Sequence, residues 1–253
     1  MQTTKHEFAL FWQGKKSLVE SIRIRTFSID DTILFHRIIT VLRAKKDDEF
    51  TLFDQAVYCI VKIIAVEKKC IQVLVLTSHV NNPIKPSVTF LLPLLKRDAL
   101  HEAMYSLTEV GCTTIQLITT KKIHGSWHQE REIEKLQKIV IAAAEQSKNF
   151  NFPEILSPIN LETALKQSKN DTTKIFFDPT GVSCETYFKN STSKEAINPS
   201  YVLLIGPEGD LTQEEKDLVA AAHFTSVKLT QTILRAQQAA TLGAGIVRSF
   251  IDK

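Results

Sequence analysis

The residues best suited to chemistry form a short turn, Gly206-Pro207-Glu208-Gly209, directly after the apolar run "YVLLI" at residues 201–205. The chain has only eight glycines and eight prolines in 253 residues, so three of them in four positions stand out. Glycine lets a ligand approach the backbone closely, and proline stiffens the loop. If the apolar run is a central parallel strand, the turn lies at its carboxyl end, where open α/β sheets bind ligands. The alternative is a turn that only joins a strand to a helix.

A helix is predicted directly after this turn. Thr212 precedes "QEEKDLVAAA", and Glu215 follows it by three residues, which is the spacing of a capping box. The result would be a rigid loop that presents free backbone amides.

A second candidate segment is "LTQTILRAQQAATLGAGI", residues 229–246. We expect a short strand to end in Leu229-Thr230-Gln231-Thr232, and Ile233-Leu234-Arg235 to open an Ala-rich helix. An arginine at a helix N-terminus opposes the helix dipole unless an anion or a partner is near. The small residues at 239, 240, 243, 244 and 245 would allow close packing against another helix or subunit. The alternative is an ordinary closing helix with one solvated arginine.

The elements that carry these segments alternate between strand and helix from residue 88 onwards. "RDALHEAMYSLTEV" places its apolar residues on one helical face, namely Leu100, Ala103, Met104, Leu107 and Val110, and Gly111 follows as a stop signal. "CTTIQLITT", "KIFFDPTG" and "SVKLT" are predicted strands, and "EREIEKLQKIVIAAAEQSK" is a predicted long helix. This alternation indicates a mostly parallel α/β sheet.

The first third of the chain has a different pattern. "EFTLF", "AVYCIVKIIAVE" and "CIQVLVLT" are short β-type runs separated by charged turns, which predicts a small antiparallel sheet or barrel. "SHVNNPIKPS", residues 78–87, is the clearest linker. We therefore expect two domains, residues 1–77 and residues 84–253.

Charge also separates the two parts. Residues 1–78 carry 12 lysines and arginines against 9 acidic residues, whereas residues 79–253 carry 19 of each. The whole surplus of +3 thus lies in the first third, where it would suit a phosphate-bearing partner. The alternative is a lysine-rich solvated face.

Several other function classes find no support in the sequence. The Walker-type, G-x-G-x-x-G and G-x-S-x-G motifs are absent, and the four cysteines form no CxxC pair. His124 and His128 are four residues apart but have no suitably spaced carboxylate, so we expect no metal site. No apolar run is long enough to cross a membrane, and no secretory signal is evident, so we expect a cytoplasmic protein.

Five segments follow one family pattern in order and spacing. They are "HRIITVLRAKKDDEFTLFD", "TEVGCTTIQLI", "IVIAAAEQSKNFNFPEI", "LLIGPEGDLTQEE" and "LTQTILRAQQAA". Together they resemble segments of the 16S rRNA (uracil-N3)-methyltransferases of the SPOUT superfamily, the RsmE type. The last two resemble the cofactor-loop signatures of that family.

The resemblance implies a fold and a set of ligands. It implies an N-terminal PUA-like β-barrel that contacts RNA, then a SPOUT α/β domain whose C-terminus threads a trefoil knot. It also implies a homodimer that methylates uridine N3 in the 16S rRNA of the small ribosomal subunit, with S-adenosylmethionine as cofactor. The residues that would line the cofactor are Gly206, Pro207, Glu208, Gly209, Leu229, Ile233, Leu234 and Arg235. The turn after "KIFFDPTG" would form a third loop.

The chain departs from the family pattern near the expected site. Asp210 stands where the family usually has a second glycine, and "LTQTILR" lacks a glycine and an arginine of Leu-Gly-x-Arg-Ile-Leu-Arg. A family glutamate is replaced by Gln237 or Gln238, and the arginine after Glu-Gln-Ser is missing, with Lys148 nearby. These changes affect catalytic groups more than main-chain cofactor binding.

N3 of uridine carries a proton on the Watson–Crick edge, so the enzyme must take an unpaired base and help that proton leave. Arg235 is our candidate to stabilise the developing uracil anion or an adjacent phosphate. Glu109 is the one carboxylate considered as a general base, with a positioning role as the alternative. Two other readings stay open: a catalytically impaired rRNA-binding or ribosome-assembly protein of the same fold, and an α/β enzyme that uses another nucleotide.

Overall fold

The computed structural model describes residues 8–14, 16–122, 129–169, 171–191 and 200–251. The chain forms two compact units, the first made of residues 1–82 and 144–151 and the second of residues 83–143 and 152–253. The division between Asn82 and Pro83 falls inside the segment 78–87 that the sequence marks as a linker.

The first unit is built on a five-stranded sheet in the order β1-β3-β4-β5-β2. The alternating runs of the sequence form antiparallel pairs, as predicted, whereas β1 runs parallel to β3. The strands are β1 (Ala9–Phe11), β2 (Thr26–Ile29), β3 (Glu49–Phe53), β4 (Val57–Val66) and β5 (Ile71–Val80).

The core of this unit forms on one side of the sheet, and short helical segments complete the unit. They are α1 (Leu18–Arg23), α2 (Thr32–His36) and the π-helical turn η1 (Arg37–Val41). The guanidinium of Arg37 donates to both carboxylate oxygens of Glu145, at 2.9 and 2.6 Å. Glu145 also accepts from the backbone N–H of Phe11 at 2.9 Å, so this carboxylate ties residues 144–151 to the unit.

The second unit is built on a six-stranded sheet in the order β11-β9-β10-β6-β7-β8. All five neighbouring pairs are parallel, which confirms the α/β prediction. The strands are β6 (Val88–Pro93), β7 (Thr114–Thr119), β8 (Glu154–Asn160), β9 (Thr173–Ser183), β10 (Tyr201–Ile205) and β11 (Thr225–Lys228).

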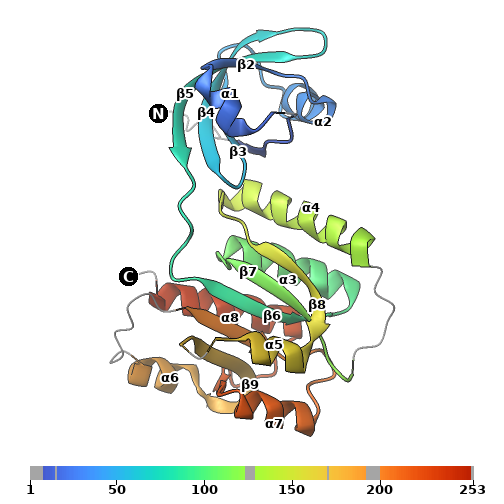
Figure 1. The fold of residues 1–253 in the computed structure, drawn as a ribbon, viewed down its shortest axis with the longest axis vertical. Helices are drawn as coiled ribbons and strands as arrows, with labels where there is room; N and C mark the ends of the chain where they lie inside the picture. The colour runs from blue at the N-terminus through green and yellow to red at the C-terminus, as the bar shows by residue number, and fades with distance from the viewer. Residues whose placement is uncertain (1–7, 15, 123–128, 170, 192–199, 252–253) are drawn as a thin grey trace. The chain divides into compact units, whose positions relative to one another are not determined.

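Helices cover both faces of this sheet (Figure 1). The helices are α3 (Arg97–Glu109), α4 (Gln129–Ser147), α5 (Leu161–Gln167), α6 (Cys184–Ser191), α7 (Gln213–Ala221) and α8 (Ala236–Ile251). Successive residues of a strand point to opposite faces, so Leu203 and Ile205 join one core with α3 and α8, while Val202 and Leu204 join the other with α5 and α7. The carboxyl ends of the central strands are left open at one edge of the sheet.

The predicted helix over residues 97–109 is confirmed, with four of its five predicted apolar residues buried. Val110 is the exception, because it is the C-cap and lies half-buried. Gly111 follows at φ +82°, the left-handed conformation that favours glycine after a helix. Its carbonyl accepts two hydrogen bonds from the buried guanidinium of Arg248, which fastens α8 to the end of α3.

The predicted start of the last helix is wrong by three residues. The helix begins at Ala236, and residues 233–235 are not helical. A helix starting at Ile233 would need the carbonyl of Thr232 as its first acceptor. In the structure that carbonyl accepts the hydroxyl of Thr230 at 2.6 Å, and the carbonyl of Arg235 is the one that accepts at the start of the helix, from the N–H of Ala239 at 2.9 Å.

Candidate active site

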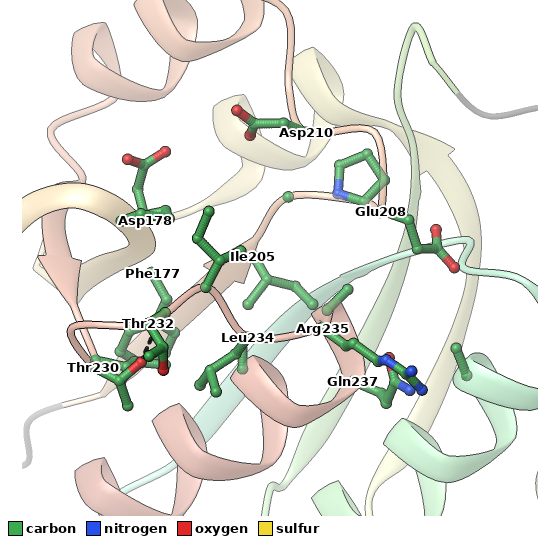
Figure 2. Close-up of a pocket in the computed structure, with 18 of the residues that line it drawn as sticks. Phe177, Asp178, Ile205, Glu208, Asp210, Thr230, Thr232, Leu234, Arg235 and Gln237 are labelled. Atoms are coloured by element: carbon green, nitrogen blue, oxygen red, sulfur yellow. Dashed lines mark hydrogen bonds between the residues drawn. The ribbon is translucent and has the colours of Figure 1, made fainter.

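A pocket of about 870 Å³ lies at the carboxyl ends of β6, β9, β10 and β11. This is the edge at which open parallel sheets bind ligands. The loops after β6, β10 and β11, residues 177–179 of β9 and the first turns of α3 and α8 line the pocket (Figure 2). The lining residues are 96–99, 177–179, 205–208, 210, 228–230, 232–237 and 239.

The structure brings together most of the residues that the sequence singled out for cofactor binding. Gly206, Pro207, Glu208, Leu229, Ile233, Leu234 and Arg235 all line this pocket. Gly209 is not among the lining residues; its carbonyl accepts from Nζ of Lys122 at 2.8 Å.

Glu109 is not brought to the pocket. It is exposed in the last turn of α3, whereas Arg97, Asp98 and Ala99 at the other end of that helix line the pocket. At 1.5 Å per residue, Glu109 lies about 18 Å along the helix axis from Arg97. The sequence pattern could not show which end of α3 meets the pocket, because the same apolar face runs along the whole helix.

The loop after β10 is held in one conformation by local bonds. The N–H of Asp210 donates to the carbonyl of Pro207 at 2.9 Å, and Oδ1 of Asp210 accepts from the N–H of Leu211 at 2.7 Å. Asp210 has φ +59°, a left-handed conformation that aspartate tolerates better than most side chains. A β-carbon on Gly206 would lie 3.1 Å from Oδ1 of Asp210, so the glycine makes room for this carboxylate.

The predicted capping box at the start of α7 is confirmed. The N–H of Glu215 donates to Oγ1 of Thr212 at 3.3 Å, and the N–H of Thr212 donates to Oε2 of Glu215 at 2.9 Å. Oε1 of Glu215 also accepts from the N–H of Lys121 at 2.7 Å, in the loop after β7. Glu208 is fixed in a similar way, since its Oε1 accepts from the N–H of Lys96 at 2.9 Å. The loop after β10 is thus anchored to the loops after β6 and β7.

The loop before α8 supplies an apolar wall. Ile233 is 85% exposed although it is aliphatic, and Leu229 and Leu234 are half-buried beside it. An exposed branched side chain on a pocket wall is suited to contact a flat apolar group. Arg235 follows at the same wall, exposed, and its side chain has no hydrogen bond or ion pair within the described residues.

Asp178 is a pocket residue that the sequence analysis did not single out. It lies in β9 directly after Phe177, the last residue of β9 that pairs with β10, and its side chain is 2% exposed. Burial raises the pKa of this carboxyl, but hydrogen bonds from Lys216 and Thr180 outweigh burial, so the pKa lies below its ordinary value. The only signal in the sequence was the turn "DPTG", which marks a loop but not a charge partner 38 positions away.

Gln237 lies in the pocket wall at the second position of α8 and is 7% exposed. Its Nε2 donates to a carboxylate oxygen of Glu102 on α3 at 3.3 Å. Figure 2 draws Gln237 and Arg235 at the same part of the pocket, while the carboxylates of Asp178 and Asp210 point to another side.

The described residues hold no cluster of three or more histidine, cysteine or acidic side chains that could bind a metal ion. His124 and His128 lie outside the described residues. In the part of the chain that the structure describes, no helix is long and apolar enough to cross a membrane.

Known proteins resemble this chain in sequence over most of its length. A family model for an RNA methyltransferase domain matches residues 82–248. A Rickettsia conorii protein named ribosomal RNA small subunit methyltransferase E is 31% identical over 84% of this chain and 85% of its own length. A Buchnera aphidicola protein of the same name is 27% identical over 81% and 82%.

This chain belongs to the methyltransferase E family.

Solved structures share the fold of this methyltransferase E chain. A Neisseria gonorrhoeae ribosomal RNA small subunit methyltransferase E, bound to S-adenosyl methionine, matches with a TM-score of 0.80 over 96% of this chain and 98% of its own, at 21% identity. A Legionella pneumophila structure of a putative methyltransferase in complex with S-adenosylmethionine matches with a TM-score of 0.78 over 97% and 98%, at 19% identity. These identities are too low to carry residue roles across.

The structure gives physical accounts of two departures from the methyltransferase E pattern. Asp210 replaces a glycine at a position with positive φ, and its own side chain bonds the next amide, which offsets part of the strain. Thr230 replaces the glycine of the last loop, and its hydroxyl closes a turn onto Thr232. In both places a side-chain hydrogen bond stabilises the conformation of the loop.

Proposed function

We propose that this protein transfers a methyl group from S-adenosylmethionine to N3 of a uridine in the 16S rRNA of the small ribosomal subunit. The observation that carries the proposal is the pocket at the carboxyl ends of β9, β10 and β11, built from the loops that contain Gly206 and Ile233. It occurs in a chain whose relatives carry the name of small-subunit rRNA methyltransferases.

The pocket fits S-adenosylmethionine in size and in chemistry. Its volume of about 870 Å³ lies within the range of small-molecule sites. The apolar side chains of Leu229, Ile233 and Leu234 suit an adenine ring, and the carboxylates of Glu208 and Asp210 suit hydroxyl and cationic groups. S-adenosylmethionine, when bound, supplies an electrophilic methyl group on a sulfonium.

Arg235 is the residue we propose for charge stabilisation. Removal of the N3 proton leaves negative charge on uracil, and a guanidinium next to the pocket would stabilise that charge or hold a neighbouring phosphate. Its exposed side chain, without a partner in the described residues, is available for this role. Glu109 is too far along α3 to take the proton, so we assign no general base from this chain.

We further propose that residues 1–77 form a PUA-like, RNA-binding barrel and that residues 84–253 form a SPOUT domain with a C-terminal trefoil knot. The five-stranded sheet of the first unit and its surplus of basic residues support the first part. The fold likeness to the Neisseria gonorrhoeae enzyme supports both parts.

The protein is proposed to act as a homodimer in the cytoplasm, where it meets the small ribosomal subunit. The partly exposed apolar residues Leu242 and Phe250 on α8 support a further contact surface. The small residues of α8 do not, because Ala240, Gly243 and Ala244 are buried within the chain itself.

The test is methyl transfer from labelled S-adenosylmethionine to small ribosomal subunits that lack the modification, with the product base identified by mass spectrometry. We expect N3-methyluridine at a single position. Binding of both S-adenosylmethionine and rRNA without transfer would instead support a catalytically impaired rRNA-binding protein of the same fold. A pocket that binds another nucleotide but not S-adenosylmethionine would contradict the proposal.

A further inference from the structure

Lys216 joins the two acidic side chains that line one side of the pocket. Its Nζ lies 2.8 Å from Oδ2 of Asp178 and 2.8 Å from Oδ2 of Asp210. Asp178 belongs to strand β9, Asp210 to the loop after β10, and Lys216 to the first half of α7. One ammonium group therefore connects strand β9 to the loop after β10, and both segments line the pocket.

The two ends of this bridge differ in how firmly they are held. Asp178 is buried, and its Oδ1 accepts from both the N–H and the hydroxyl of Thr180 while Oδ2 accepts from Lys216. The side chain of Asp210 is 56% exposed and sits on a loop in a left-handed conformation. The buried carboxylate of Asp178 is thus the fixed end of the bridge. Lys216 holds the loop that carries Asp210 to it.

Without the charge of Lys216, repulsion between Asp178 and Asp210 would move the loop after β10 away from β9. The two carboxylate oxygens both lie 2.8 Å from one nitrogen atom, so the two charges repel each other when nothing neutralises them. Asp178 cannot move into water, because its side chain is buried in strand β9 and bonded there to Thr180. The repulsion would act on Asp210 and move the loop of residues 206–210.

We infer that Lys216 is a positioning residue: it holds the loop of Gly206 to Asp210 against strand β9 and thereby sets the affinity of the pocket for its ligand. For the identity of that ligand the inference rests on the proposed function. The bridge itself is a property of the chain alone and is testable without ligand.

The first experiment measures the loop without ligand. In Lys216→Met the aliphatic stem is kept and the charge is removed, so α7 retains its packing. We expect backbone amides of residues 206–212 to exchange with deuterium about tenfold faster than in the wild type, which corresponds to a local opening about 1.4 kcal/mol easier. Unchanged exchange in this segment would overturn the inference whatever the ligand is.

The second experiment measures the dissociation constant for S-adenosylmethionine by calorimetry in a double-mutant cycle. Lys216→Met should weaken binding about tenfold, and Asp210→Asn alone should weaken it less. The double variant should bind better than Lys216→Met, because the repulsion between Asp178 and Asp210 is gone. A role of Lys216 in packing alone predicts that the losses add, and additive losses would contradict the bridge.

Lys166→Met on α5 is the matched control, since Lys166 also pairs with one acidic residue, Glu162, but lies outside the pocket. It should leave both the exchange rates and the affinity unchanged. If the wild-type protein does not bind S-adenosylmethionine, the proposed function fails while the exchange measurement still decides on the bridge.

Discussion

Gly243 of α8 lies against the ring of Phe177 so closely that a β-carbon at position 243 would be 2.4 Å from Cε2 of that ring. Phe177 lines the pocket and is the last residue of β9 that pairs with β10. Helix α8 therefore packs directly against the ring of Phe177 in the pocket wall. Because Gly243 has no side chain, the ring can lie this close to the helix.

Gly243→Ala should push Phe177 toward the pocket. We expect the free energy of unfolding to fall by about 1–3 kcal/mol from overpacking, and the affinity for S-adenosylmethionine to fall as well. Denaturant unfolding and calorimetry measure the two effects. Gly245→Ala is the control, because a β-carbon there meets Val110 at an ordinary 3.8 Å and should be neutral or gain about 0.5–1 kcal/mol of helix stability. Equal behaviour of the two variants would contradict this account.

Arg235→Ala should lower methyl transfer by about 10²–10³-fold, the loss typical for one group that stabilises developing charge. Because the side chain is exposed and unpaired within the described residues, stability and S-adenosylmethionine affinity should change little. Glu109→Gln should keep turnover within about twofold, since Glu109 lies about 15 Å along α3 from Ala99, the pocket residue of that helix nearest to it. Single-turnover assays on small subunits compare the variants. Full activity of Arg235→Ala would refute its role.

Gln237→Glu should destabilise the protein. It places a second carboxylate against Glu102 at a position that is 7% exposed, in place of an amide donor at 3.3 Å. We expect a loss of about 1–3 kcal/mol at pH 7 and a smaller loss at pH 5, where the new carboxyl can take up a proton and donate again. Adding Glu102→Gln should restore most of the stability. If Gln237→Glu alone is as stable as the wild type at pH 7, the pair is not energetically coupled.

Low pH should weaken the ion pair between Lys216 and Asp178. The pKa of Asp178 is lower in the folded protein than its ordinary 3.8, so its charge stabilises the fold fully above that value, and this stabilisation is lost as the pH falls through the folded pKa. Burial lowers the pKa of Lys216, but the hydrogen bonds to Asp178 and Asp210 raise it above 10.5, so its contribution is lost only as the pH rises past the folded value.

Asp178→Asn should therefore cost about 1–3 kcal/mol near neutral pH, and the difference from the wild type should shrink below about pH 4. Urea unfolding at a series of pH values measures this difference. Asp171→Asn, at an exposed position, is the control and should show no such trend. A difference that is constant from pH 7 to pH 3 would show that the charge of Asp178 is not what stabilises the fold.

Features set by near neighbours in sequence were predictable. The capping box of Thr212 and Glu215, the stop at Gly111 and the amphipathic face of α3 each depend on residues within about one turn. The parallel sheet was predictable because alternating strands and helices leave few other arrangements. The position of Gly206 at the pocket was predictable as well, because this turn follows a central parallel strand and ligands bind at the carboxyl ends of such strands.

Features set by distant side chains were not predictable. The start of α8 at Ala236 lies beyond a turn in which the hydroxyl of Thr230 donates to the carbonyl of Thr232, and the helical pattern of the following residues gave no sign of that turn. The pairing of Asp178 with Lys216 joins positions that only the fold brings together. Glu109 was chosen for its chemistry alone, and helical periodicity gives a face but not the end that meets a site.

The central pair of the second sheet has a consequence for folding speed. Val88 of β6 is paired with Tyr201 of β10, more than 100 residues later in the chain. Until β10 is in place, the apolar edge of β6 stays without its neighbour, and the conformational entropy of the intervening segment opposes the closure. Parallel pairings of such long range are slow to form, so this unit should refold far more slowly than the hairpin of β4 and β5 in the first. During that interval β6 is an unpaired edge strand, and an unpaired apolar edge is where aggregation would begin.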